Sequence, residues 1–165
     1  MRGACDAPDH PNLWFDIEAE EAADFYCSVF PNSKITAVAR YPEGGPREAG
    51  MVMTVSWVLD GEEFTGINGG PEFKFDEAVS FAINCADQAE VDYYWEKLTA
   101  DGGEEGLCGW LKDRFGVSWQ VVPAGWEDVY TSGDPGRAAR AMQAMMGMKK
   151  LDLAALQAAA DGAGG

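Results

Sequence analysis

The stretch NLWFDIEAEEAADFYCSVF at residues 12–30 decides the fold, because it joins a short aromatic strand to an amphipathic helix. Apolar residues of the helical part recur at the i, i+3, i+4, i+7 and i+8 spacing of one helix face. They are Ala22, Phe25, Tyr26, Val29 and Phe30. The first turn is acidic, as the helix dipole favours, and a Pro-Asn pair ends the helix. Strand patterns follow at residues 34–41 and 51–69, the second split by an Asp-Gly turn. The order is therefore β-α-β-β-β.

The same order begins again with a strand at residues 79–85 and a helix at residues 88–98. An offset of 68 lays the DFY of residues 24–26 over the DYY of residues 92–94 and sets Asn12 opposite Ser80. A Gly-rich loop and two further strands, at residues 106–113 and 117–123, complete the second half. An internal repeat of this length predicts the architecture of the whole domain.

The repeat predicts an α+β fold of paired βαβββ units, which are ferredoxin-like half repeats, followed by a helical tail. We expect one domain over residues 1–133, with halves at residues 11–70 and 78–123, and a C-terminal extension at residues 134–165. In the extension, an Asp-Pro pair starts one helix, and Asp152 caps a second with Leu151 and Leu156 as a hydrophobic staple. Met142, Met145 and Met146 share a helix face and are interpreted as packing surface.

Composition excludes several classes of protein. The net charge of −16 repels polyphosphate and anionic lipid, so we expect neither nucleic acid nor a membrane as a partner. The four cysteines lack CxxC spacing, and His10 is the single histidine, so no zinc set or redox pair is predicted. No signal peptide or apolar run of membrane-spanning length is found, which favours a reducing, cytoplasmic location.

Several separated motifs resemble one family: PNLWFD (11–16), AEEAADFY (19–26), NGGPEFKFDEAVSF (68–81), DYYWEKL (92–98), GWLKDRFGVSWQVVP (109–123) and MQAMMGMKKLDL (142–153). The chain is similar to the PhnB-like, or demethylubiquinone methyltransferase-like, family of the vicinal oxygen chelate superfamily, which also holds the glyoxalases and bleomycin resistance proteins. The resemblance implies a glyoxalase-like fold whose sheets curl around a cavity, and with the apolar tail face it favours a homodimer. No glycine-rich turn follows a first strand, so we expect no S-adenosylmethionine site and no cofactor.

In metal-using relatives, each half supplies one ligand from its first strand and one from its last. The resemblance places these positions at Asn12, Thr65, Ser80 and Gln120, with Asn68 replacing Thr65 if the strand carries a bulge. All are uncharged, and such groups alone give little affinity for a transition metal, so no metal site is predicted. The positions instead suggest a recognition site among aromatic side chains.

Strand alternation supplies the walls of that site. Residues 12, 14 and 16, residues 80, 82 and 84, and residues 118, 120 and 122 each share a face, while for residues 51–59 alternation leaves the choice of face open. The side chains of four tryptophans could be core packing or ligand platforms: Trp14, Trp57, Trp110 and Trp119. Ligand-binding candidates are Asn12, Trp14, Thr65, Asn68, Phe73, Phe75, Ser80, Trp110 and Gln120. Phe73 and Phe75, which flank Lys74, belong to a lid or a rigid linker.

No catalytic residue is predicted. His10 precedes the first strand, where we expect a mobile arm too far from any serine or cysteine to activate it. Asp16 and Asp113 lie at turns and are interpreted as structural. We therefore expect a protein that binds a small organic molecule. The alternatives are a metal-dependent lyase, dioxygenase or transferase that uses Asp16, Glu18, Glu62 or Glu63, and an interaction module that works through the Met-rich helices.

Overall fold

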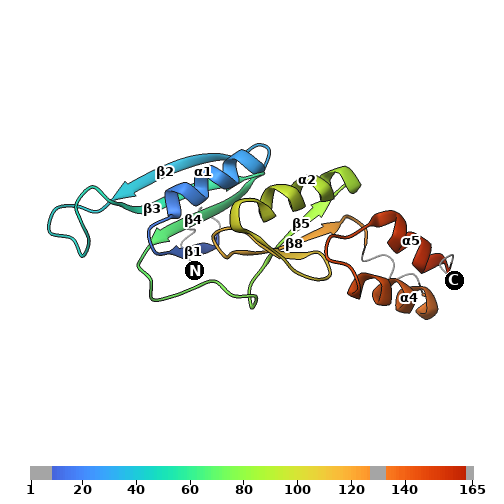
Figure 1. The fold of residues 1–165 in the computed structure, drawn as a ribbon. Coiled ribbons are helices and arrows are strands. Elements are labelled where there is room, and N and C mark those ends of the chain that lie inside the picture. Colours follow the sequence, from blue (N-terminus) through green and yellow to red (C-terminus); the bar gives the residue numbers. More distant parts are fainter. Residues whose placement is uncertain (1–8, 127–132, 163–165) are drawn as a thin grey trace, which may run out of the picture. The chain divides into compact units, whose positions relative to one another are not determined.

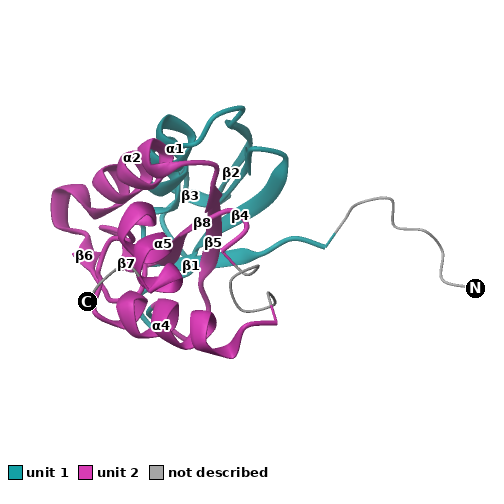
Figure 2. Cartoon of the chain, turned by 90° about the vertical axis from the view of Figure 1, so that its right-hand side faces the viewer, with its two compact units in different colours: residues 1–74 teal, residues 75–165 magenta. Residues whose placement is uncertain are grey.

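The computed structural model describes residues 9–126 and 133–162 of the chain. The chain divides into two compact units, residues 1–74 and residues 75–165, shown in teal and magenta in Figure 2. The predicted halves fall one in each unit, and the helical tail belongs to the second unit. Each unit is described by itself.

The first unit is a four-stranded sheet with one helix (Figure 1). Its elements are β1 (Asn12–Phe15), α1 (Ala19–Val29), β2 (Lys34–Arg40), β3 (Val52–Leu59) and β4 (Glu62–Asn68). The strand order is β1-β4-β3-β2, with β1 parallel to β4 and the other neighbours antiparallel. The predicted βαβββ order is confirmed.

The helix α1 covers one face of this sheet, because it buries an apolar stripe there. Tyr26 and Val29 are buried as predicted, and Tyr26 lies against Trp57, which in turn stacks on Phe64 at a centroid distance of 5.8 Å. In β3, Val55, Trp57 and Leu59 are buried on the side of the helix, and Val52 at the start of the strand is buried as well. This answers the question that alternation left open: Thr54, Ser56 and Val58 lie on the opposite face.

The second unit repeats the plan with β5 (Phe81–Cys85), α2 (Gln88–Thr99), the 3-10 turn η1 (Ala100–Gly102), β6 (Glu104–Glu105), β7 (Trp110–Lys112) and β8 (Ser118–Pro123). The strand order is β5-β8-β7-β6, again with the outer first strand parallel to the last. The sequence predicted one strand over residues 106–113. That prediction was wrong: residues 106–109 form a loop, and the additional strand β6 has only two residues.

Asp113 organises the turn between β7 and β8. Its Oδ1 accepts hydrogen bonds from the backbone N–H of Phe115 and Val117, at 2.9 and 3.0 Å, and its Oδ2 accepts one from Trp119 Nε1 at 2.8 Å. Both Asp113 and Trp119 are buried. These bonds confirm the structural interpretation of this carboxylate and place Trp119 in the core.

The tail forms a C-terminal hairpin of α4 (Pro135–Met146) and α5 (Leu153–Asp161), whose capping by Asp134 and Asp152 is as predicted. The segment between the two helices docks on the second unit. Its backbone accepts hydrogen bonds from the N–H groups of Cys108 and Gly109, and Leu151 is fully buried beside Gly109. A Cβ at Gly109 would lie 2.8 Å from a backbone oxygen and 3.1 Å from Leu151 Cδ1, so only glycine fits this contact.

Ion pairs flank this docking segment. Lys149 contacts Glu105, and Lys150 contacts Asp92. A hydrogen bond from Trp95 and the neighbouring Lys149 lower the pKa of Glu105, and Lys150 and Gln88 lower the pKa of Asp92. Within the described ranges, no helix combines the length and apolar character that a membrane crossing requires.

Candidate functional site

In each unit, one face of the sheet is covered by its helix, and we call the other face the open face. The alternation predicted for the walls is confirmed by burial. In β5, Ile83 and Cys85 are buried toward α2, whereas Ala82 and Asn84 are exposed. Burial also raises the pKa of Cys85 to about 12, so this thiol stays protonated and unreactive.

On the open face of the first unit, Asn12 and Thr65 are direct neighbours in the parallel β1–β4 ladder. Thr65 Oγ1 lies 3.3 Å from Ser56 Oγ and 3.1 Å from His10 Nε2. The sequence predicts His10 in an arm before the first strand, away from serine and cysteine side chains, and in the structure its ring contacts the hydroxyl of a threonine on β4. Sequence reasoning missed His10 because a residue before the first strand has no periodicity to place it.

The indole of Trp14 is held rigidly on the same open face. Its Nε1 donates to the carbonyl of Gly70 at 2.8 Å, and the ring covers Gly69, where any Cβ would lie 2.1 Å from a ring carbon. Phe73 meets the ring edge-on at a centroid distance of 5.0 Å, although 65% of Phe73 remains exposed. Trp14 is half-buried. Its position on the open face fits both predicted roles, which are packing in the core and stacking against a ligand.

Asn68 is not available on the open face. It is buried, its Oδ1 accepts from the backbone N–H of Ala19 at 2.9 Å, and its Nδ2 donates to the Val52 carbonyl at 3.1 Å. The β3–β4 register is continuous from Thr54 to Leu59, so the bulge that would have turned Asn68 outward is absent from this ladder. Its amide instead satisfies a donor at the start of α1.

In the second unit, the two predicted positions are in direct contact. Gln120 Nε2 donates to Ser80 Oγ at 2.9 Å, although Ser80 lies just before β5 rather than inside it. Ser118, on the same face, is buried, and its hydroxyl donates a hydrogen bond to the Asp76 carbonyl. Phe75, the last of the aromatic candidates, is half-buried in the segment that leads to β5.

A cavity of about 750 Å³ lies on this open face, and we call it the tail cavity because α4 forms one wall. The sheet contributes Asn84, Gln120 and Val122, and the β6–β7 side contributes Trp110 and Cys108. The turn at residues 123–126 and the side chains of Met142 and Met145 complete the described lining. The sequence analysis interpreted these methionines as packing surface. Their i, i+3 spacing predicted only that the two side chains lie on the same face of one helix.

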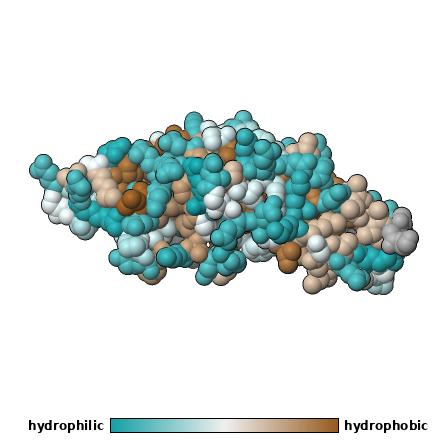
Figure 3. Space-filling model, viewed as in Figure 1, coloured by the Kyte–Doolittle hydropathy of each residue, from teal (hydrophilic) through white to brown (hydrophobic). Residues whose placement is uncertain are grey.

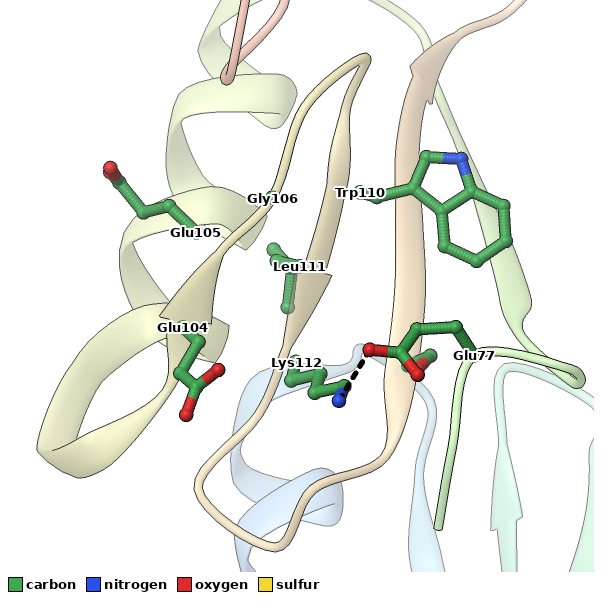
Figure 4. Close-up of a pocket in the computed structure, with 8 residues that line it drawn as sticks. Glu77, Glu104, Glu105, Gly106, Trp110, Leu111 and Lys112 are labelled. Atoms are coloured by element: carbon green, nitrogen blue, oxygen red, sulfur yellow. Dashed lines mark ion pairs between the residues drawn. The ribbon is translucent and has the colours of Figure 1, made fainter.

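A smaller hollow of about 110 Å³ is also lined by Trp110 (Figure 4). We call it the lysine hollow, since Lys112 pairs there with Glu77, and Glu104 also lines it. The hydrogen bond raises the pKa of Lys112 and lowers the pKa of Glu77. Charged side chains therefore line the lysine hollow, whereas none of the described residues that line the tail cavity is charged.

The residues at the four family positions do not fit a divalent ion. Two are hydroxyls and two are carboxamides, and none of them supplies the anionic or imidazole donors that offset dehydration of the ion. Asp16 is instead paired with Arg47, and Glu18 accepts a hydrogen bond from a neighbouring backbone N–H. Over residues 9–126 and 133–162, no three His, Cys, Asp or Glu side chains are grouped so that they could hold a metal ion.

Comparison with known proteins decides the family. A family model described as 3-demethylubiquinone-9 3-methyltransferase matches residues 9–122, which include both sheets. The chain belongs to this PhnB-like family. A comparison with curated proteins gives no match.

Solved structures agree with this assignment. The PhnB protein from Bacillus cereus is 34% identical over 72% of this chain and all of its own, with a TM-score of 0.65. Protein PA1353 from Pseudomonas aeruginosa is 20% identical over 71% of this chain and 97% of its own, with a TM-score of 0.58. The fosfomycin resistance protein FosX from Listeria monocytogenes, solved with Mn(II) and sulfate, is 13% identical over 79% of this chain and all of its own, with a TM-score of 0.51. The PhnB-like chain thus has the glyoxalase-like fold of the vicinal oxygen chelate superfamily.

Proposed function

We propose that this PhnB-like protein binds a small organic molecule in the tail cavity without the help of a metal ion. The observation that carries the proposal is the cavity itself. Its volume of about 750 Å³ lies within the range of ligand pockets, about 300–1,000 Å³. Apolar walls surround two carboxamides. Of the four residues predicted for a ligand site in this unit, Trp110 and Gln120 line the cavity, whereas Phe75 and Ser80 do not.

Two enzyme activities suggested by relatives receive less support. The methyl transfer in the family's description needs a site for a methyl donor, and a nucleotide-like donor would be held by a glycine-rich turn between a strand and a helix. The strand-to-helix turns after β1 and β5 contain no glycine. The FosX structure contains Mn(II), which suggests metal-assisted chemistry for that protein. Such chemistry needs charged metal ligands, but the four family positions of this chain hold amides and hydroxyls. Binding is therefore the function that the described residues support best.

Titration of tryptophan fluorescence against a metabolite library tests this proposal. We expect at least one compound to give a saturable change, because Trp110 lies in the cavity wall, and we expect the same dissociation constant with a chelator present. Trp110→Phe should remove most of the signal change while leaving the compound bound by calorimetry. A library without any saturable response, or a response that requires added Zn, Ni, Mn or Fe, would contradict metal-free binding.

A further inference from the structure

The tail cavity differs from the rest of this protein in its charge. The chain as a whole carries 28 acidic and 12 basic residues. Yet none of the described residues that line the cavity is Asp, Glu, Lys, Arg or His. In the lysine hollow, which shares Trp110 with the tail cavity, Lys112 and Glu77 form an ion pair with one another. A charged ligand group in the tail cavity would thus lose water without gaining a partner among these residues.

The polar side chains of the cavity are uncharged and can form hydrogen bonds with a ligand. Gln120 uses its Nε2 to bond Ser80, and its carbonyl oxygen accepts no hydrogen bond from the part of the chain that the structure describes. Asn84 forms no side-chain hydrogen bond within these residues either, and it is exposed on the sheet. A ligand that offers a donor to Gln120, and a donor or an acceptor to Asn84, would satisfy both.

The apolar part of the lining favours an aromatic ring. Trp110 and Trp126 present indole rings, and Met142 and Met145 present thioethers, which make favourable contacts with aromatic faces and edges. The two methionines come from the C-terminal hairpin, so the tail adds its thioether contacts to those of the indole ring on β7. Figure 3 shows weakly hydrophobic surface over part of the hairpin, next to hydrophilic surface at its lower edge.

We infer that the tail cavity selects an uncharged aromatic molecule that carries a hydrogen-bond donor, such as a carboxamide or a phenol. This inference rests on the proposed function and specifies its ligand class. Met142 is a specificity-determining residue of α4, because like Met145 it lines the cavity, whereas Met146, one turn further along the same helix, does not. Both methionines are partly exposed, at 46% and 64%, so either can be replaced by a charged residue without disrupting the core.

Three probes of one size and different charge test the inference: 2-naphthamide, 2-naphthoate and 2-naphthylmethylammonium. Binding to the full chain is measured by calorimetry at pH 7 in about 0.15 M salt, which limits the long-range effect of the protein's net charge. We expect naphthamide to bind at least tenfold more tightly than either ion. Met142→Glu should weaken naphthamide at least tenfold and improve the ammonium probe, whereas Met146→Glu should keep the order of the unmodified protein.

The outcomes separate this inference from the proposed function. Equal or tighter binding of an ion, with Met142→Glu still altering affinity, would overturn the ligand class and leave the cavity as the binding site. Equal effects of the two glutamate variants would place the probes elsewhere and overturn the inference. Absence of binding by all three probes would also overturn it, while the library titration decides separately whether the cavity binds any small molecule.

Discussion

Replacement of Asp113 by alanine is expected to lower the free energy of unfolding by about 3 kcal/mol, because three donors would lose their acceptor. Two of these are backbone N–H groups of the β7–β8 turn, and the third is the indole N–H of Trp119. The site is buried, so water cannot replace the carboxylate without opening the turn. The turn also sets the register of β8, which carries Gln120.

Urea unfolding monitored by circular dichroism measures this effect. Glu96→Ala is the matched control, since Glu96 is exposed on α2 and its loss should change stability by no more than about 0.5 kcal/mol. A loss below about 1 kcal/mol for Asp113→Ala would show that the turn does not depend on the carboxylate, and the structural interpretation of this residue would have to be abandoned.

Leu151→Ala is expected to destabilise the protein by about 3 kcal/mol and to loosen the C-terminal hairpin. Leu151 is fully buried, it fills the space above Gly109, and its carbonyl accepts a hydrogen bond from Gln88. Truncation leaves a cavity at the point where the hairpin is attached to the second unit. Because α4 forms a wall of the tail cavity, ligand affinity should fall together with stability.

Hydrogen exchange of the α4 and α5 amides, combined with urea unfolding, reports on this docking. Leu107→Ala serves as the control, because Leu107 lies in the neighbouring β6–β7 loop and is 58% exposed. Its loss should leave both the exchange pattern and the stability nearly unchanged. If the hairpin amides of Leu151→Ala keep the protection of the unmodified protein, then the hairpin is held by contacts other than this leucine.

Much of the fold could be predicted from the sequence, because its main signals are local. The helical spacing of Tyr26 and Val29, and of Val91 and Trp95, places both helices on their sheets. The internal offset pairs the two halves and places Ser80, and the family resemblance places Gln120, which contacts Ser80 in the structure. By contrast, β6 has two residues, which is too short for any alternation to be recognised.

The candidate site could be predicted only in part, because its remaining residues are brought together by tertiary contacts. Trp57 and Trp119 are core residues, while Trp14 and Trp110 lie on open faces, and only burial distinguishes the two pairs. Met142 reaches the cavity through the docking of the hairpin, which combines backbone hydrogen bonds to Cys108 and Gly109 with the burial of Leu151. Likewise, the contact of His10 with Thr65 joins residues far apart in the sequence, which no periodic pattern reports.

Methyl NMR of methionine-labelled protein tests most directly whether ligands occupy the tail cavity. The chain has seven methionines, of which Met142 and Met145 line the cavity, while Met51 and Met53 belong to the first unit. For a compound selected by fluorescence, we predict saturable shifts of the Met142 and Met145 methyl signals, with those of Met51 and Met53 unchanged. Saturable shifts confined to Met51 and Met53, or none at all, would contradict the account.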